Sequence, residues 1–336
     1  MGDIALAVAS ETLRLNKPFR ISGHVFETSD VVVVTLREGD LRGRGEGCGV
    51  YYLGDDLAHM LSEIEAARDA IEGGLTREEL RAAMPPGGGR NAVDCALWEL
   101  EAARAGETAW ALAGVPVLKP LLTTFTLGAD TPEVMADGAR AYADARAIKV
   151  KLTGDLPLDL ARVAAVRSAR PDIWLGVDGN QGFQRGDLDE LVDALQAHDV
   201  KLLEQPLARG KEAELEDFES AIPIAGDESL VSLVDLPNAP GRFDVVNIKL
   251  DKCGGLTEGL LMAAEARRLG LQVMVGTMVG TSLSTAPGLI LGQQCDIVDL
   301  DGPTFLAADR APGVDYIDGM VSAAPAVWGS GKVLTA

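Results

Sequence analysis

The stretch RAIKVKLTGD, residues 146–155, holds two lysines inside an otherwise aliphatic run. Lys149 and Lys151 alternate with aliphatic residues, which is the period of two that a β-strand produces. A strand with one charged face normally turns that face to solvent, so the simplest interpretation is a surface strand. The rest of the chain decides between that interpretation and a pair of buried charges.

Short strand-like segments recur along the chain on both sides of this stretch. Eight of them can be recognised: LTTFTLGA (122–129), AIKVKL (147–152), IWLGVDGN (173–180), VKLLEQPL (200–207), IPIAGDES (222–229), DVVNIKL (244–250), LQVMVGTM (271–278) and CDIVDLDG (295–302). Amphipathic stretches such as PLDLARVAAVRSAR (157–170) lie between them. Strands that alternate with helices predict a parallel sheet, and eight such units predict a (β/α)8 barrel or a close variant.

The segments before and after the barrel predict a second, smaller α+β unit. Residues 1–55 have the pattern of β-strands, and residues 56–113 have the periodicity of helices. The C-terminal tail has no room for another strand–helix unit, so we expect it to pack on the N-terminal segment. We therefore predict an N-terminal domain at 1–117, the barrel at 118–304 and a returning tail at 305–336.

Composition and charge exclude several classes of protein. The 336 residues include 51 acidic and 30 basic side chains, a net charge of −21, and such a surface repels nucleic acids. No run approaches the roughly 18–20 apolar residues that a membrane span needs, and the N-terminus does not resemble a signal peptide. The four cysteines show no C-x-x-C pairing, which favours reduced thiols and a cytoplasmic location.

Charged or amide side chains stand at the carboxyl end of six of the eight predicted strands. In chain order they are Lys149, Lys151, Asp178, Asn180, Glu204, Asp227, Glu228, Asn247, Lys249, Asp299 and Asp301. Steps of 27, 26, 23 and 22 residues lead from Lys151 through three carboxylates to Lys249, and 50 more lead to Asp299. Each step is about one strand–helix unit, so we expect one ring of side chains around the barrel mouth, where the active sites of such barrels lie.

Three carboxylates on adjacent strands predict a metal site inside this ring. Asp178, Glu204 and Asp227 offer hard oxygen ligands, which suit Mg²⁺. Lys151 and Lys249 flank the three carboxylates from opposite sides. Beside a divalent cation, the pKa of a buried lysine can fall toward the range of a base. The cation could then hold a substrate carboxylate and stabilise an enolate while one lysine removes the α-proton.

The motifs of this ring resemble those of the enolase superfamily, in its muconate-lactonizing-enzyme subgroup. They are KVK (149–151), DGN (178–180), EQP (204–206), GDES (226–229) and NIKLDKCGG (247–255). The resemblance implies a (β/α)7β modified TIM barrel, with an α+β capping domain formed by the N-terminal segment and the C-terminal tail. It also implies that NKPFRIS (16–22) and GRGEG (43–47) are capping-domain loops that close over the substrate.

The resemblance assigns roles to the main members of the ring. Asp178, Glu204 and Asp227 would bind one Mg²⁺ per subunit. Lys151 and Lys249 would be the acid/base pair, because a lysine base beside Mg²⁺ is a known pattern of this superfamily. Two bases on opposite faces of an α-carbon suit racemisation or epimerisation, although lactonizing and dehydrating members keep the same lysines.

Five further residues complete the predicted site. Lys149, Asn180 and Glu228 would orient the metal-binding residues and balance their charge. Asp299 and Asp301 are two residues apart and so share a strand face. Members of the subgroup that epimerise dipeptides carry a similar Asp-x-Asp, which receives the free α-ammonium of the substrate. We therefore predict epimerisation of a dipeptide at the α-carbon of its second residue, through an enolate.

The second residue of the dipeptide depends on the capping segment. Relatives that act on L-Ala-D/L-Glu place a basic side chain in the first capping loop, where this chain offers Arg20 and His24. We expect L-Ala-D/L-Glu or a related L-Ala-L-Xaa dipeptide as the substrate. An N-acylamino-acid racemase, a cycloisomerase and a binding protein without catalysis remain alternatives, and assembly into a homo-oligomer is compatible with the sequence.

Overall fold

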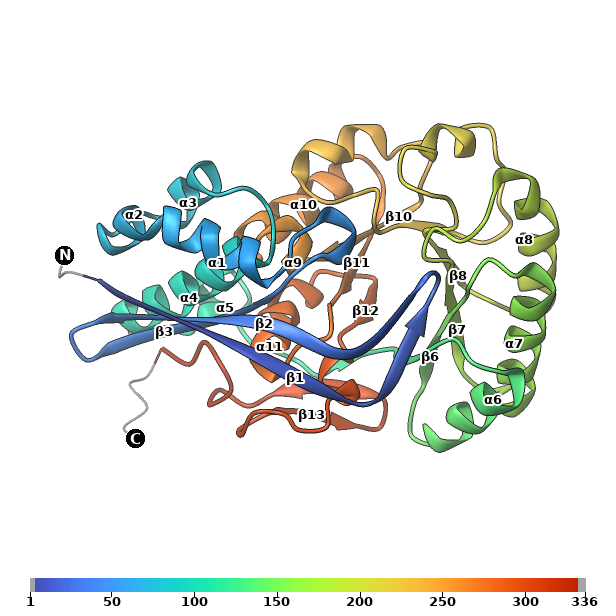
Figure 1. Ribbon diagram of the computed structural model, residues 1–336, viewed down its shortest axis with the longest axis horizontal. Coiled ribbons are helices and arrows are strands. Elements are labelled where there is room, and N and C mark those ends of the chain that lie inside the picture. The colour runs from blue at the N-terminus through green and yellow to red at the C-terminus, as the bar shows by residue number, and fades with distance from the viewer. Residues whose placement is uncertain (1–3, 332–336) are drawn as a thin grey trace.

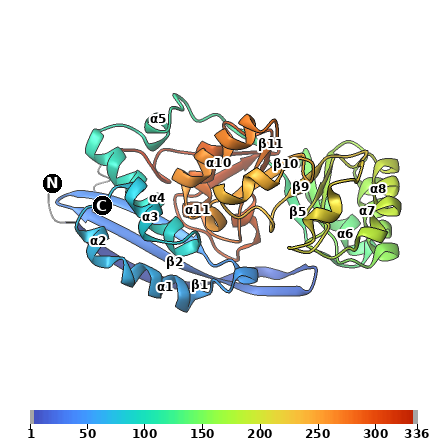
Figure 2. The same ribbon diagram turned by 90° about the horizontal axis from the view of Figure 1, so that it is seen from above.

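A computed structural model describes residues 4–331 of the chain, which form a strand–helix barrel and a layer of sheet and helices beside it (Figure 1). Figure 2 shows helices α6, α7 and α8 on the side of the barrel that faces away from helices α1–α4. Among the helices of residues 4–331, none is both long and apolar enough to cross a membrane.

Within the described residues, eight parallel strands form the barrel in the sheet order β12-β11-β10-β9-β8-β7-β6-β5. They are β5 (Phe125–Leu127), β6 (Ala147–Lys151), β7 (Trp174–Asp178), β8 (Leu202–Glu204), β9 (Ile224–Gly226), β10 (Val245–Lys249), β11 (Gln272–Gly276) and β12 (Ile297–Asp299). The barrel is nearly closed, because the backbone N–H of Thr124, just before β5, donates to the carbonyl of Val298 in β12 at 3.0 Å.

Helical connections run between successive barrel strands in the part of the chain that is described. They are α6 (Pro132–Ala141), α7 (Leu156–Ala169), η2 (Arg185–Asp187) with α8 (Leu188–Ala197), η3 (Glu212–Leu215), η4 (Leu233–Asn238), α9 (Leu250–Cys253) with α10 (Leu256–Arg268), and α11 (Ser282–Gly292). Two of these helices begin at residues that favour a helix N-terminus. Thr131 caps α6 just before Pro132, and Asp155 caps α7. The predicted (β/α)7β barrel is confirmed, with only short 3₁₀ turns after β8 and β9.

Successive side chains along each barrel strand point alternately to the hydrophobic shell outside the sheet and to the barrel interior. In β6, Ile148 and Val150 belong to the large core beneath the outer helices, while Lys149 and Lys151 point the other way. A separate small cluster fills the floor of the barrel; it consists of Leu202, Ala225, Val245 and Met274. The two lysines are only 2% and 6% exposed, so the interpretation of a solvent-facing strand is wrong.

The N-terminal segment confirms the predicted order of strands followed by helices. It contains β1 (Ala5–Ile21), β2 (His24–Glu38), β3 (Leu41–Cys48), η1 (Tyr51–Leu53), α1 (Leu57–Ala66), α2 (Arg68–Glu72), α3 (Arg77–Ala83), α4 (Gly88–Ala105) and α5 (Ala109–Leu112). The β1–β2 hairpin reaches across to the barrel (Figure 1), where the backbone N–H of Ala129 donates to the carbonyl of Arg20 at 2.9 Å.

The glycines of GRGEG lie in a strand, so the prediction of a closing loop at residues 43–47 is wrong. Gly43, Gly45 and Gly47 share one face of β3, which packs against α4. A Cβ atom added to any of them would lie 2.0 Å from a backbone carbonyl oxygen of α4. Glycine is therefore required for the close approach of strand and helix. A glycine-rich segment of this kind resembles a loop when only the sequence is considered.

The C-terminal tail contacts both the barrel and the N-terminal segment. After η5 (Gly302–Phe305), strands β13 (Val314–Ile317) and β14 (Met320–Ala323) form a hairpin that pairs with β4 (Leu121–Leu122). Farther along, the indole N–H of Trp328 donates to the carbonyl of Arg44 at 2.8 Å. The tail returns to the N-terminal segment as expected, while the domain boundaries at residues 117 and 304 stay a prediction.

Gly45→Ala should destabilise the protein by about 3 kcal/mol, because the added methyl group must push β3 away from α4. Gly186→Ala is the control, since a Cβ at that position would meet no atom within 4 Å. Urea unfolding of both variants measures the difference in the free energy of unfolding. Similar stabilities for the two variants would contradict the account of the β3–α4 contact.

Candidate active site at the barrel mouth

Strand register brings the predicted charged residues to one end of the barrel. Lys151 at the end of β6 lies opposite Asp178 of β7, which in turn lies opposite Glu204 of β8. Lys249 and Asp299 end β10 and β12, on the other side of the sheet order. All five side chains are buried, so the structure gathers them into an enclosed cluster.

Three carboxylates of this cluster form a group that could hold a metal ion. Asp178, Glu204 and Asp227 are at most 1% exposed, and one oxygen atom of each lies within 4.8 Å of the other two. Burial and the neighbouring charge of Asp178 raise the pKa of Glu204 to about 7. A hard divalent cation would relieve this repulsion, and carboxylate oxygens are the ligands that such cations prefer.

Unpaired oxygens beside the triad also fit a bound cation with its water molecules. Asn180 Oδ1, Glu228 Oε2 and Asn247 Oδ1 are buried and have no hydrogen-bond partner within residues 4–331. The amide of Asn180 donates to Glu228 Oε1 at 3.2 Å, and that of Asn247 donates to Glu204 Oε1 at 2.7 Å. Unsatisfied buried acceptors cost free energy, which a cation and its hydration waters would recover.

The backbone is strained within two residues after two of these carboxylates, Asp178 and Glu204. Asn180 has a φ of 40° and Gln205 has a φ of 34°, a left-handed conformation that is uncommon for residues with side chains. The turn lets the N–H of Asn180 donate to Asp178 at 2.8 Å. The side-chain oxygen of Gln205 accepts from the N–H of Asp227 at 3.0 Å. Strain that is retained beside a polar cluster is typical of functional sites.

Two lysines approach the triad from opposite sides. Lys151 Nζ lies 2.5 Å from Asp178 Oδ2, and Lys249 Nζ lies 2.7 Å from Asp227 Oδ2. Burial lowers the pKa of Lys249, but the carboxylates around it, above all Asp227, raise it well above its usual value. The expected fall in a lysine pKa depends on a divalent cation, whose charge would offset these carboxylates.

Gly276 makes room for Lys249, and sequence reasoning missed it because β11 ends without a charged residue. The two residues are paired across β10 and β11. A Cβ atom at Gly276 would lie 3.0 Å from Lys249 Cε and 2.7 Å from Asn247 Oδ1. The lysine can therefore extend over the end of the neighbouring strand only because that strand ends in glycine.

Lys252 is fully buried and holds Asp227 in place. Its ammonium donates to Asp227 Oδ1 at 2.6 Å, to the carbonyl of Asn247 at 3.0 Å and to that of Leu230 at 3.1 Å. Burial alone would raise the pKa of Asp227, but Lys249 and Lys252 together hold it far below its usual range. Asp227 thus stays ionised inside the barrel.

Lys149 links the triad to the aspartates of the last strand. Its ammonium pairs with Glu204 Oε2 at 3.2 Å and with Asp299 Oδ2. Asp299 also accepts a hydrogen bond from the Thr124 hydroxyl. Asp301 Oδ2 accepts from the backbone N–H of Thr126 at 2.6 Å, and burial together with Asp299 raises the pKa of Asp301 to about 7. The two aspartates are therefore neighbours with different partners.

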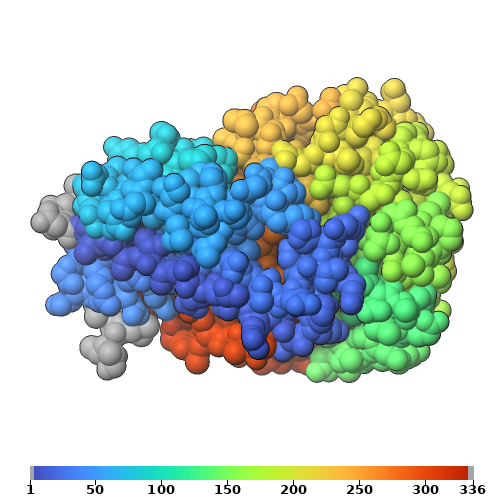
Figure 3. Space-filling view, in the orientation of Figure 1, coloured from blue at the N-terminus to red at the C-terminus, as the bar shows by residue number. Residues whose placement is uncertain are grey.

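A cavity of about 460 Å³ lies between the barrel mouth and the N-terminal segment, and a hollow opens beside the β1–β2 hairpin (Figure 3). Its barrel side contains Lys151, Asn180, Asp227, Glu228 and Lys249. Its other side contains Phe19, which belongs to the predicted closing segment NKPFRIS, and three aromatic residues that the sequence analysis missed, Phe26, Tyr51 and Tyr52. The adjacent tyrosines in a glycine-rich segment were the one signal available in the sequence.

The predicted basic residues of the capping segment lie outside the cavity lining. Arg20 is exposed and forms an ion pair with Asp130 at 3.6 Å. The ring of His24 packs against that of Tyr51, with 4.7 Å between their centroids. Neither residue lines the cavity, so their part in substrate binding stays a prediction.

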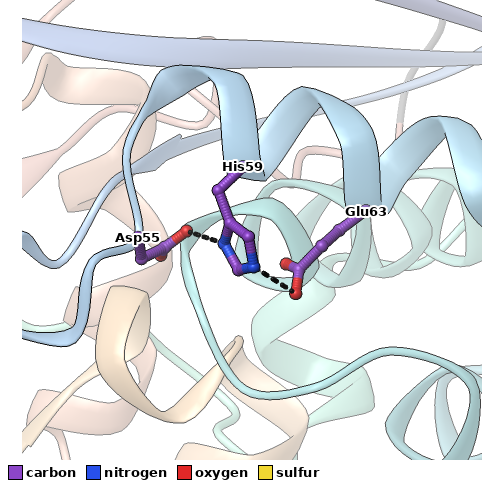
Figure 4. A group of neighbouring side chains, drawn as sticks. All are labelled: Asp55, His59 and Glu63. Carbon is purple, nitrogen blue, oxygen red and sulfur yellow. Dashed lines mark hydrogen bonds and ion pairs between the residues drawn. The ribbon is translucent and has the colours of Figure 1, made fainter.

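A second cluster of polar side chains, Asp55, His59 and Glu63, lies at the wall of the cavity. The ring of His59 lies between two carboxylates (Figure 4), with 3.0 Å from Nδ1 to Asp55 Oδ1 and 3.4 Å from Nε2 to Glu63 Oε1. The hydrogen bond that His59 donates to the Asp55 carboxylate raises the pKa of His59. Asp55 also accepts from the N–H of Gly88 at 2.9 Å and lines the cavity. Because both ring nitrogens already face carboxylates, the group positions Asp55.

Two family models match the chain, one for each part of the fold. The model described as mandelate racemase/muconate lactonizing enzyme, N-terminal domain, matches residues 3–114. The model described as enolase C-terminal domain-like matches residues 134–325.

Curated relatives match almost the full chain. An L-Ala-D/L-Glu epimerase of Escherichia coli is 39% identical, over 93% of this chain and 97% of the relative. An N-acetyl-D-glutamate racemase of a Pseudoalteromonas species is 36% identical, over 87% and 92%. A hydrophobic dipeptide epimerase of Roseobacter litoralis is 35% identical, over 94% and 95%. Relatives of similar identity thus have different named substrates.

Solved structures agree in fold. An enolase family member from Agrobacterium tumefaciens with homology to dipeptide epimerases, bound to sodium and L-Ala-L-Glu, has a TM-score of 0.93 at 39% identity and covers 97% of this chain and 100% of its own. A dipeptide epimerase from Methylococcus capsulatus, complexed with Mg and L-Arg-D-Lys, has a TM-score of 0.89 at 29% identity, over 96% and 97%.

Mg²⁺ should raise the unfolding temperature of the metal-free protein, because the triad that could hold the ion is assembled only in the folded state. At a hundred times Kd, the stabilisation amounts to about 2.7 kcal/mol. Glu204→Gln should weaken Mg²⁺ binding at least tenfold, whereas Glu63→Gln makes the same chemical change in the His59 group and should not affect it. Calorimetric unfolding measures both, and an equal loss in the two variants would contradict the assignment.

Proposed function

The chain belongs to the mandelate racemase/muconate lactonizing enzyme family of the enolase superfamily, and we propose on that premise that it is a Mg²⁺-dependent dipeptide epimerase. The reaction moves the α-proton of the second residue from one face of the α-carbon to the other, through an enolate. The observation that carries the proposal is the placement of Lys151 and Lys249 on opposite sides of a buried carboxylate triad.

Asp178, Glu204 and Asp227 would hold one Mg²⁺ ion. The fit rests on the closeness of their oxygen atoms and on the unpaired oxygens of Asn180 and Glu228 beside them. When bound, the ion would hold the substrate carboxylate and stabilise the negative charge of the enolate. Asn180 and Glu228, which line the cavity beside the triad, would keep it oriented.

Each lysine would serve one face of the substrate α-carbon. Strands β6 and β10 are separated by three strands in the described eight-stranded sheet, so their lysines stand across the barrel mouth from each other. One lysine, as a neutral amine, takes the α-proton, and the other, as an ammonium, returns a proton to the opposite face. The roles reverse for the other epimer, which makes the reaction run in both directions.

Asp299 at the end of β12 and Asp301 just after it would receive the free α-ammonium of the dipeptide. Asp299 is already held by Lys149, so Asp301 is the better candidate for a direct contact. Its pKa of about 7 shows that the buried carboxylate lacks full charge compensation, and an ammonium beside it would favour its ionised form. Lys149 would keep Asp299 and Glu204 in place without touching the substrate.

An N-acylamino-acid racemase is the second candidate, favoured by the Pseudoalteromonas relative that acts on N-acetyl-D-glutamate. Such a substrate has no α-ammonium, so it gives Asp301 nothing to bind. The buried aspartate pair therefore favours the free dipeptide.

We also infer a reducing, cytoplasmic setting, because all four cysteines are free. A homo-oligomer stays a prediction.

Proton exchange in D₂O tests the proposed function. The protein with Mg²⁺ should add one deuterium to the second residue of an L-Ala-L-Xaa dipeptide, and EDTA should abolish the exchange. Asp301→Asn should lower kcat/KM for free dipeptides about a hundredfold, because the ammonium loses a buried partner, while an N-acetylated amino acid should be unaffected. Mass spectrometry follows both reactions. Exchange on N-acylated substrates alone would establish the alternative, and exchange on neither would contradict the proposal.

A further inference from the structure

We infer that the second side chain of the substrate is uncharged, so that neutral dipeptides rather than glutamate dipeptides are the preferred class. The inference rests on the proposed function, because it concerns the same cavity. It follows from the direction in which that side chain must point and from the residues that meet it there.

The four substituents of the α-carbon have distinct surroundings in this site. The α-proton moves along the line between Lys151 and Lys249, and the carboxylate faces the metal triad. The amide nitrogen leads to the first residue, whose ammonium lies toward Asp301. The barrel floor beneath the site is filled by apolar side chains, so the fourth substituent must point out of the barrel mouth toward the N-terminal segment.

The part of the cavity that this side chain would enter has an aromatic wall. Phe26 and Tyr51 pack edge to face with 5.4 Å between ring centroids, and Tyr51 packs against Tyr52 with 5.1 Å. Phe19 and Ile21 of the hairpin continue the same surface. These side chains offer a large apolar contact area, which suits an aliphatic, aromatic or amide side chain.

The charges along this wall are negative. Asp30, Asp55 and Asp56 line the cavity, and among the described residues the only cationic side chains in its lining are the two lysines at the reacting centre. Asp55 accepts a hydrogen bond from the N–H of Gly88, and its other oxygen lies 3.0 Å from His59 Nδ1 (Figure 4), so both of its oxygens have partners that hold it at the cavity wall.

A substrate carboxylate at this wall would lose water, and the described residues of the cavity lining offer it no lysine or arginine apart from the two lysines at the reacting centre. It would also face carboxylates of the same sign, and both effects disfavour binding of the charged form. An amide of the same shape suffers neither effect. The relatives do not decide the matter, because those of similar identity are named for glutamate and for hydrophobic dipeptides.

The comparison of L-Ala-L-Gln with L-Ala-L-Glu tests the inference, because the two side chains have the same shape and differ in charge. With the intact Mg²⁺-loaded protein, kcat/KM for L-Ala-L-Gln should be at least tenfold higher. An equal or higher value for L-Ala-L-Glu would overturn the inference and leave the epimerase proposal standing. Absence of exchange on every dipeptide would instead overturn the proposed function, and this inference with it.

A pair of arginine variants tests whether the wall itself sets the preference. Phe26→Arg adds a cation to the cavity lining and should raise the ratio of kcat/KM for L-Ala-L-Glu over L-Ala-L-Gln at least tenfold. Val25→Arg adds the same charge at the neighbouring residue, which is 53% exposed and outside the lining, and should leave the ratio unchanged. Equal shifts in both variants would contradict the inference, and the wild-type comparison stands even if Phe26→Arg does not fold.

Discussion

The burial of three carboxylates at one end of the barrel is the constraint on which the rest of the site depends. Asp178, Glu204 and Asp227 are closed off from water, and their mutual repulsion has to be compensated from within the barrel. Buried lysines on β6, β10 and α9 supply part of this compensation. The same charges prepare the reaction, because the lysines that neutralise the triad also flank the place where a substrate carboxylate would bind.

The fold stabilises this charged cluster by placing the residues that support it and the residues that would react in different parts of the barrel. Short parallel strands place each charge at a strand end, and apolar side chains fill the floor below and the shell outside. The N-terminal segment then closes the cavity from above through a hairpin that is anchored to the barrel. The glycines of β3 let that strand pack closely against α4 within that segment. Substrate selection is thereby assigned to a wall that does not take part in proton transfer.

Sequence patterns predicted the barrel and its charged cluster well, because strand spacing and strand-end residues are local features. Lys151, Asp178 and Glu204 stand in one row because their strands are in register, and their regular spacing already indicated this. Close packing between particular side chains and backbone of distant segments could not be predicted. Glycine in β3 has the composition of a loop, and the opening that Gly276 leaves for Lys249 exists only once β10 and β11 pair. For the same reason, the aromatic wall and the pairing of Lys149 with Asp299 required the structure.

Proton exchange by single-lysine variants tests the two-base geometry most directly. Lys151→Ala and Lys249→Ala, each with Mg²⁺ in D₂O, would be given both epimers of one dipeptide and followed by ¹H NMR. The account predicts that each variant loses epimerisation by about a thousandfold yet still exchanges the α-proton of one epimer, with opposite epimers in the two variants. Exchange of the same epimer by both variants, or of both epimers by either one, would contradict the placement of one base on each face.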